Sequence, residues 1–493
     1  MTTTSEPVAP RSDRRFAAWV AIAFFVVACL SMLRHEMWRD ELEAFLAGRD
    51  SANPIDVVRN TRYNGHPVTW YLLLHAVTRI THDPRGMQLL HAFIATAGVY
   101  VVARHAPFSR LQRVLFCFGY FPLFEYGVIS REYVLGVVAL FAFCAAYAAG
   151  ANVIVLALIA GLLAQTSAYG MMISMALAAT VVLARIAPRS MGVPPMPHGR
   201  DARATNVLAC VIYLVALGLG ALQLIPPADS GTVVGWTFDN PIRLFPLSIV
   251  WRAIVPVPPI DPQFWNENVV GSNKIVGPLS LLLFPIVLLA LRKHRVALVL
   301  FAIGSMGLMT FGFIKFYGSI RHHGHMYLIL IAALWLAASA EPLCRRLSAM
   351  FTGLLVVHVI AAIIAISIDW VRPFSQSKAT AAFLRERGLA GAFLIGERDT
   401  FTAPIAAYLD RTIYFPRGDR IGSYIIYDQR RVPPVSNNLV EISRAKAREI
   451  GGEVVLISTS PLPDDASAGV THIGSFTGSV VGDEDFFLYQ VLP

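Results

Sequence analysis

The chain has 493 residues, of which 55% are hydrophobic and 15% are charged, and its mean hydropathy is +0.56. A soluble protein of this length covers itself with more polar groups, so this composition excludes the soluble globular class. The formal net charge is +9, but the basic residues cluster between apolar runs, as in the cytoplasmic loops of membrane proteins. The charge therefore does not indicate nucleic-acid binding. We predict an all-α polytopic membrane protein.

Apolar runs of about 16–20 residues, close to the length that crosses a bilayer core, recur along the chain. The basic clusters between them should be cytoplasmic, because positive residues are retained inside. They lie at residues 11–15, 104–113, 185–203, 292–295 and 345–346. If these clusters are cytoplasmic, about eleven membrane spans fit between them. The N-terminus is then cytoplasmic and the C-terminus external. We predict spans near residues 16–33, 87–103, 112–129, 134–149, 152–168, 169–186, 206–225, 275–291, 296–314, 326–340 and 349–368.

A long first outer loop is predicted at residues 34–86. Its segment Pro67–Ile80 is apolar but too short for a span, and counting it as one would place later basic clusters outside. We predict a re-entrant or interfacial helix there. A second short helix should begin after Asn53, a favourable N-cap, with Pro54 at its first position.

The remaining polar segments divide the chain into a transmembrane part, residues 1–368, and a soluble outer domain, residues 369–493. A second long outer loop is expected at residues 226–274, and a cytoplasmic linker at 190–200. In the soluble domain, helical and strand-like patterns alternate, which predicts a small α/β fold. These patterns lie at Ala379–Arg387, Phe393–Ile395, Val440–Ile450 and Val454–Ser458.

Four polar clusters fall on the outer face of this topology. They contain Asp40 and Glu41, then Asn64–Pro67, then Ser130–Tyr133, then Arg321–His325. Ionisable residues at a bilayer boundary are costly to hold and indicate a functional site. A carboxylate can accept the proton of an attacking hydroxyl, while arginine and histidine bind a phosphate leaving group. A lipid-linked sugar monophosphate would present its phosphate at this depth.

The first of these clusters also resembles a known family. The stretch Trp38-Arg39-Asp40-Glu41, followed by Asn64-Gly65-His66-Pro67 and Trp70-Tyr71-Leu72-Leu73, is similar to the first-loop signature of C-type (GT-C) glycosyltransferases. The similarity is to the bacterial branch of this family that is related to protein O-mannosyltransferases and the lipid A aminoarabinose transferase. Some relatives have Pro-Pro after the histidine, whereas Val68 follows Pro67 here.

The resemblance implies a bacterial inner-membrane glycosyltransferase. Such an enzyme takes a sugar from a polyprenyl-phosphate donor, inverts the anomeric centre, and transfers the sugar to a glycan, lipid or protein acceptor. It would make Asp40 the general base, with Glu41 orienting Asp40 or the sugar. We predict substrate contacts by Arg39, His66, Arg131, Tyr133, Arg321, His322 and His323. No metal or cofactor is expected.

Other interpretations of these residues stay open from the sequence. The two acids could simply favour a helix N-terminus or pair with Arg39 or Arg34. Glu43 is expected on a solvated face. Arg321 and His325, four residues apart, suit a phosphate clamp on one helix face, whereas three histidines in four positions could bind zinc.

Three other functions compete with glycosyl transfer. An oligosaccharyltransferase-like enzyme would use a diphosphate donor and a divalent cation, for which dispersed carboxylates are few. A transporter or flippase would place charges near the bilayer midplane and show inverted repeats, which we do not find in this sequence. A structural anchor for the soluble domain would leave the first loop without a pocket.

Overall fold

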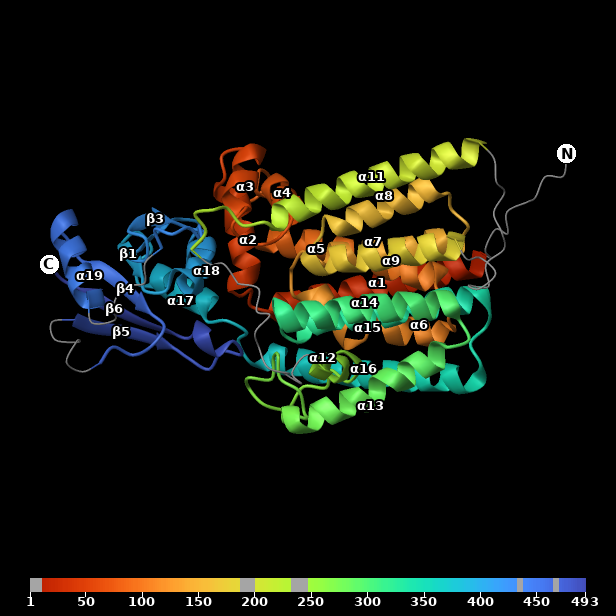
Figure 1. Cartoon of the computed structure of the whole chain (residues 1–493). Helices are drawn as coiled ribbons and strands as arrows, with labels where there is room; N and C mark the ends of the chain where they lie inside the picture. Colours follow the sequence, from red (N-terminus) through yellow and green to blue (C-terminus); the bar gives the residue numbers. More distant parts are fainter. Residues whose placement is uncertain (1–10, 187–199, 232–246, 432–437, 464–469) are drawn as a thin grey trace.

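The computed structural model describes residues 11–186, 200–231, 247–431, 438–463 and 470–493. Apolar helices form a bundle, and a small α/β domain, with the C-terminus, lies at one end of it (Figure 1). The short helices of the first loop, residues 39–78, lie between the bundle and this domain. The prediction of a helical membrane protein with a C-terminal α/β domain agrees with this architecture.

Eight helices in the described residues are long and apolar enough to cross a membrane. They are α1 (Arg11–Arg34), α5 (Arg85–His105), α9 (Ala168–Ile186), α11 (Arg200–Leu224), α13 (Asn273–Leu291), α14 (Arg295–Ile314), α15 (Ile320–Ala340) and α16 (Arg345–Val371). Two shorter apolar helices, α7 (Tyr133–Ala148) and α8 (Val153–Ala164), match two further predicted spans. The total of eleven stays a prediction.

The predicted span at 112–129 is not one regular helix. Helix α6 (Arg110–Cys117) ends before Gly119, and the chain continues as a π-helix, η1 (Tyr120–Val128). Pro122 has no N–H to extend the α-helical ladder, and Gly119 is a poor helix former, so this is a natural breaking point. A second difference is at α15, which begins at Ile320 and so includes Arg321–His325 in its first turns.

The first loop folds into three short helices, α2 (Arg39–Asp50), α3 (Pro54–Thr61) and α4 (Thr69–Thr78). The predicted helix start is confirmed, because the Asn53 side chain accepts hydrogen bonds from the N–H groups of Ile55 and Asp56. Helices α2 and α4 pack so closely that a Cβ on Gly48 would lie 2.9 Å from the backbone nitrogen of His75. The loop is therefore a packed element.

The C-terminal domain contains a six-stranded mixed sheet of order β3-β2-β1-β4-β6-β5. Strand β1 pairs in parallel with β2 and β4, and the other pairs are antiparallel. The predicted helices and strands are present as α17 (Ser377–Glu386), β1 (Phe393–Gly396), α19 (Leu439–Ile450) and β4 (Val454–Ser458). The elements that the sequence pattern missed are α18 (Asp399–Leu409), β2 (Ile413–Phe415), β3 (Arg420–Gly422), β5 (Val470–Phe476), η4 (Gly482–Glu484) and β6 (Phe486–Val491).

The C-terminal domain shares a hydrophobic core with the first loop. Leu42 and Phe45 of α2 belong to the same buried cluster as Phe401 and Ile405 of α18. Burial of this shared surface holds the domain against α2. In the predicted loop 226–274, α12 (Ser248–Ile254) packs on α13 and α15. Residues 232–246 of that loop and nearly all of the predicted linker at 190–200 lie outside the described residues.

We expect Gly48→Ala to destabilise the protein, because the added methyl would meet the backbone of α4, which cannot move aside like a flexible side chain. Overpacking of this kind typically costs about 1–3 kcal/mol. Gly353→Ala in α16 is the control, since a Cβ there meets nothing within 4 Å. The thermal unfolding midpoint of the detergent-purified protein should fall for the first variant only. An unchanged midpoint for Gly48→Ala would contradict the tight packing of α2 on α4.

Candidate functional site

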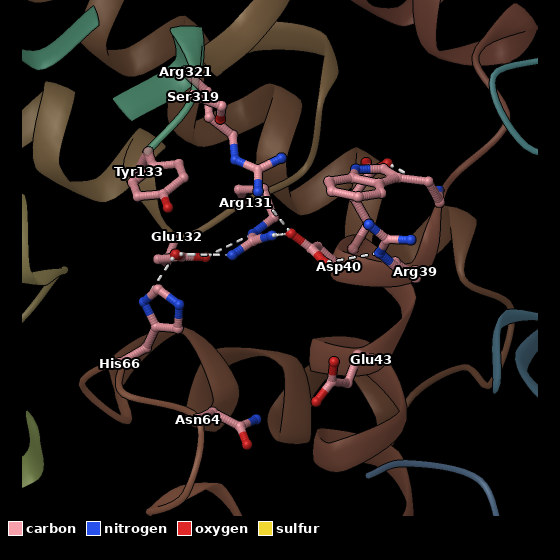
Figure 2. Close-up of polar contacts among 12 residues, drawn as sticks. Arg39, Asp40, Glu43, Asn64, His66, Arg131, Glu132, Tyr133, Ser319 and Arg321 are labelled. Carbon is pink, nitrogen blue, oxygen red and sulfur yellow. Dashed lines mark hydrogen bonds and ion pairs between the residues drawn. The ribbon is translucent and has the colours of Figure 1, made fainter. Parts of the chain in front are cut away.

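Three of the predicted polar clusters meet at Asp40. Its Oδ2 lies 2.7 Å from Nη1 of Arg131 and accepts a hydrogen bond from Nη2 of Arg321 at 3.0 Å (Figure 2). Asp40 lies in the first turn of α2, Arg131 just before α7, and Arg321 in the first turn of α15. Tertiary folding thus joins residues about which the sequence says only that they share a face of the membrane.

The two arginines determine the charge state of Asp40. Burial raises the pKa of this carboxyl, but the positive charges of Arg131, Arg321 and Arg39 lower it further, and the net shift is downward. Its side chain keeps 26% of its surface exposed. Asp40 is therefore ionised near neutral pH and, while both arginines hold it, it is a weak base.

Arg321 is supported by aromatic rings. Its Cζ lies 5.0 Å from the ring centroid of Trp38 and 5.1 Å from that of Trp265. Trp265 in turn donates from Nε1 to Oε1 of Glu125 in η1, at 3.1 Å. Cation–π contact fixes a guanidinium without occupying its N–H groups. Indeed Nε and Nη1 of Arg321 are buried and have no hydrogen-bond partner among the described residues, so they remain available to an anion.

The fourth cluster joins through Glu132. Arg131 Nε donates to Oε2 of Glu132 at 2.9 Å, and His66 Nδ1 lies 3.2 Å from Oε1. Burial raises the pKa of Glu132, but Arg131 and His66 together lower it to about 2. Burial lowers the pKa of His66 more than Glu132 raises it, so this imidazole is neutral at pH 7. His66 does not cap the following helix, whose N-cap is Val68.

Glu41, the second predicted catalytic residue, points away from Asp40. It is fully buried, and its Oε1 accepts from the Ser130 backbone N–H at 2.6 Å. Its Oε2 accepts from the Trp38 backbone N–H at 3.2 Å and lies 3.0 Å from Nε2 of His35. These contacts favour a positioning role, because they join the start of α2 to the segment that carries Arg131.

His35, which the sequence pattern did not single out, connects Glu41 to Asp369 at the end of α16. Its Nδ1 lies 3.0 Å from Oδ2 of Asp369. Burial lowers the pKa of His35, but the two carboxylates raise it to about 10. Since the unfolded value is near 6.5, the stabilising charge is fully present below that pH and is lost as the pH rises through about 10.

The other predicted substrate contacts lie around this centre. The Arg39 guanidinium lies over the Phe401 ring at 4.2 Å, and its Nε is 3.8 Å from Oδ1 of Asp40. The Tyr133 hydroxyl lies 3.0 Å from Nε2 of His322. His323 turns away, with its Nε2 3.0 Å from the carbonyl oxygen of residue 317.

The predicted clamp of Arg321 with His325 does not form, because His325 stacks on the Tyr169 ring at 4.7 Å while Arg321 faces Asp40. The start of α15 therefore directs its cationic side chains to different places. Of the three histidines in the zinc hypothesis, His322 and His325 both pack on the Tyr133 and Tyr169 rings, whereas His323 faces the carbonyl oxygen of residue 317. No group of three or more histidine, cysteine or acidic residues in the described ranges could hold a metal ion.

Glu43 is not on a solvated face, contrary to expectation. It is half-buried, and its Oε2 accepts a hydrogen bond from the Tyr427 hydroxyl at 3.1 Å. Its Oε1 is buried without a hydrogen-bond partner among the described residues. Burial and the neighbouring Asp40 raise its pKa to about 7. The only sequence signal was its place three residues after Asp40, on the same side of a helix.

A separate cavity of about 640 Å³ lies at the same end of the molecule, between the bundle and the C-terminal domain. Apolar side chains from the ends of α1 and α5, including Leu33 and Leu89, form one part of its wall. Lys378 and Arg385 of α17 contribute cations to another part. The polar cluster around Asp40 and this cavity thus both lie toward one end of the bundle.

No family model matches the sequence, and no curated protein matches it. Among solved structures, the crystal structure of ArnT from Cupriavidus metallidurans bound to undecaprenyl phosphate is similar to this chain, with a TM-score of 0.51 and 13% sequence identity. The similarity covers 96% of this chain and 97% of that one. The chain therefore shares the fold of that ArnT structure along nearly its whole length.

Proposed function

We propose that this protein is an inverting glycosyltransferase that moves a sugar from a polyprenyl-phosphate carrier to a glycan, lipid or protein acceptor at the outer face of a bacterial inner membrane. The observation that carries the proposal is the placement of Asp40 between Arg131 and Arg321. A carboxylate and two cations are the groups that deprotonation of an acceptor and departure of a phosphate require. The undecaprenyl phosphate in the ArnT structure supports a lipid partner of this class.

The arginines are proposed to exchange partners when the donor binds. The donor phosphate would take the N–H groups of Arg321 that have no partner among the described residues, and it would compete with Asp40 for both Arg321 and Arg131. Charge-assisted bonds from arginine to phosphate suit this exchange. Released from part of its ion pairing, Asp40 would become a stronger base.

The proposed reaction then balances as a single displacement. The acceptor oxygen bonds to the anomeric carbon as its proton passes to Asp40. The bond from that carbon to the phosphate oxygen breaks, and the polyprenyl phosphate leaves with the electron pair. Its additional negative charge is stabilised by Arg131 and Arg321.

The remaining residues have supporting roles in this proposal. Glu41 holds the start of α2 in place, and Arg39 lies against both Asp40 and the C-terminal domain. His66 and Tyr133 border the cluster and are the candidates for sugar contacts (Figure 2). His322 orients Tyr133, whereas the direction of His323 gives no support for a substrate contact.

The distribution of charge favours transfer over transport. Asp40, Arg131 and Arg321 lie where helices begin at the domain end of the bundle, and not at mid-length of the spans. A transporter would hold such groups near the midplane, where both sides can reach them.

We expect Asp40→Asn to abolish transfer while keeping donor binding. Asparagine is similar in size but cannot accept the acceptor's proton, and loss of a general base costs roughly a hundredfold to ten-thousandfold in rate. Arg321→Ala should also weaken binding of radiolabelled undecaprenyl phosphate, because it removes a charge-assisted contact. Purified variants in lipid would be assayed for sugar release from undecaprenyl-phosphate hexoses and pentoses. Parental turnover by Asp40→Asn would contradict the assignment of the base.

Turnover should persist after divalent cations are removed with a chelator, since arginine neutralises a monophosphate leaving group without an ion. The measurement compares sugar release in chelator with release after Mg²⁺ or Mn²⁺ is restored. Activity that vanishes and returns with the ion would instead favour the oligosaccharyltransferase-like alternative with its diphosphate donor.

The proposed orientation is tested by cysteine labelling in a variant from which the five native cysteines have been removed. An impermeant reagent applied to intact cells should label exposed Ala52→Cys and Glu449→Cys at the domain end. Arg292→Cys, at the α13–α14 turn, should be protected until the membrane is permeabilised. The reverse pattern would place the site in the cytoplasm and overturn the outer-face assignment.

A further inference from the structure

Glu43 presents a second carboxylate to the site, and the mechanism above does not use it. It lies three residues after Asp40 on α2, a spacing that puts two side chains on neighbouring positions of one helix face. Figure 2 shows both carboxylates on the same side of the cluster, with Asn64 and His66 across from them. The two acids therefore border the same space.

This space contains unpartnered hydrogen-bond acceptors. Oε1 of Glu43 and Oδ1 of Asn64 are both buried without a hydrogen-bond partner among the described residues. Nearly all buried polar atoms in proteins have partners, so two orphaned acceptors facing one space indicate a missing donor. A hydroxyl group or a water molecule has the matching chemistry. The other oxygen of Glu43 is fixed by the Tyr427 hydroxyl at 3.1 Å.

Asp40 alone is poorly suited to keep a proton. Arg131 and Arg321 reach its Oδ2 at 2.7 and 3.0 Å, and after the exchange of partners proposed above they would still lie near Asp40 while the phosphate departs. A proton taken by Asp40 would sit beside two cations, where the ionised carboxylate is strongly favoured. A nearby group with higher proton affinity would make the transfer favourable.

We propose that Glu43 is the group that receives the acceptor's proton from Asp40, directly or through one water molecule, and passes it to solvent. The inference rests on the proposed function and extends it. The acceptor O–H bond breaks, Asp40 carries the proton briefly, and the Oε1–H bond forms on Glu43. No electrons are exchanged, and the protonated Glu43 returns to its anion before the next turnover.

The charges around Glu43 are consistent with this task. Burial and Asp40 raise its pKa, while the Tyr427 hydroxyl, Arg131 and Arg431 lower it, and the result is about 7. Tyr71, on α4, is another titratable group close enough to interact with it. Because the relay needs the ionised form, turnover should rise as the pH increases through about 7.

Two measurements on the full-length protein in lipid test the relay. The first is infrared difference spectroscopy over pH, which follows the C=O band of protonated carboxyls. This band should lose amplitude in Glu43→Gln, and the component lost, obtained as the difference between parent and variant, should have its midpoint near pH 7. It should persist in the control Glu36→Gln, which removes another partly buried carboxyl of raised pKa from the same loop. In Tyr427→Phe the midpoint should move to higher pH, because the hydroxyl that stabilises the anion is gone.

The second measurement is sugar release from undecaprenyl-phosphate hexoses and pentoses as a function of pH. Glu43→Gln should lower turnover on the order of ten- to a hundredfold and remove the acidic limb of the profile. Binding of radiolabelled undecaprenyl phosphate should stay parental. Tyr427→Phe should shift the limb to higher pH in parallel with the infrared midpoint, an effect that a merely structural role would not produce.

The outcomes distinguish failure of the Glu43 relay from failure of the proposed glycosyltransferase function. Parental turnover and an unchanged pH profile in Glu43→Gln would overturn the relay and leave glycosyl transfer intact. An infrared band of undiminished amplitude near pH 7 in that variant would also overturn it. If the unmodified protein releases sugar from none of the donors, the proposed function fails and the relay fails with it.

Discussion

The imidazolium of His35, held between Glu41 and Asp369, joins the parts of the chain from which the site is built. Through Glu41 it reaches the backbone of Ser130, and so the segment that presents Arg131. Losing one partner of a buried ion pair leaves an uncompensated charge and typically costs about 3–5 kcal/mol. Because of this cost, the ion pairs of His35 fix the positions of α1, α2 and α16 relative to one another.

The three acidic residues at the start of α2 differ in charge state and role because their surroundings differ. Glu41 is enclosed by backbone donors and an imidazolium, so it is structural. Asp40 faces two arginines and stays ionised. Glu43 is half-buried, and one of its oxygens has no hydrogen-bond partner in the part of the chain that the structure describes, so its affinity for a proton is higher. Three carboxylates within four residues thus differ because of their neighbours, and such divergence is how one site obtains distinct acid–base groups.

The C-terminal domain contributes to this arrangement and is not a detached appendage. Tyr427 holds Glu43, and Glu484 accepts from the backbone N–H of Arg39. Both contacts reach helix α2 from the domain side, where the shared apolar core already fixes the domain. Through these contacts the domain can influence the proton affinity of Glu43, although it supplies neither the attacking group nor the leaving group. Its effect on chemistry would come through α2.

The sequence by itself determined the membrane class, the positions of the eight long apolar helices and the polar residues of the first loop, because hydropathy, helix caps and charge bias are local properties. It also predicted that Asp40, His66, Arg131 and Arg321 share one face. Only the tertiary structure decided which of them touch. The sequence placed Glu41 at the site and Glu43 on a solvated face, yet helix geometry turns Glu41 toward His35 and Glu43 toward Tyr427. Distant partners, such as Tyr427, which lies 384 residues after Glu43, leave no periodic or local signal, so packing alone assigns these roles.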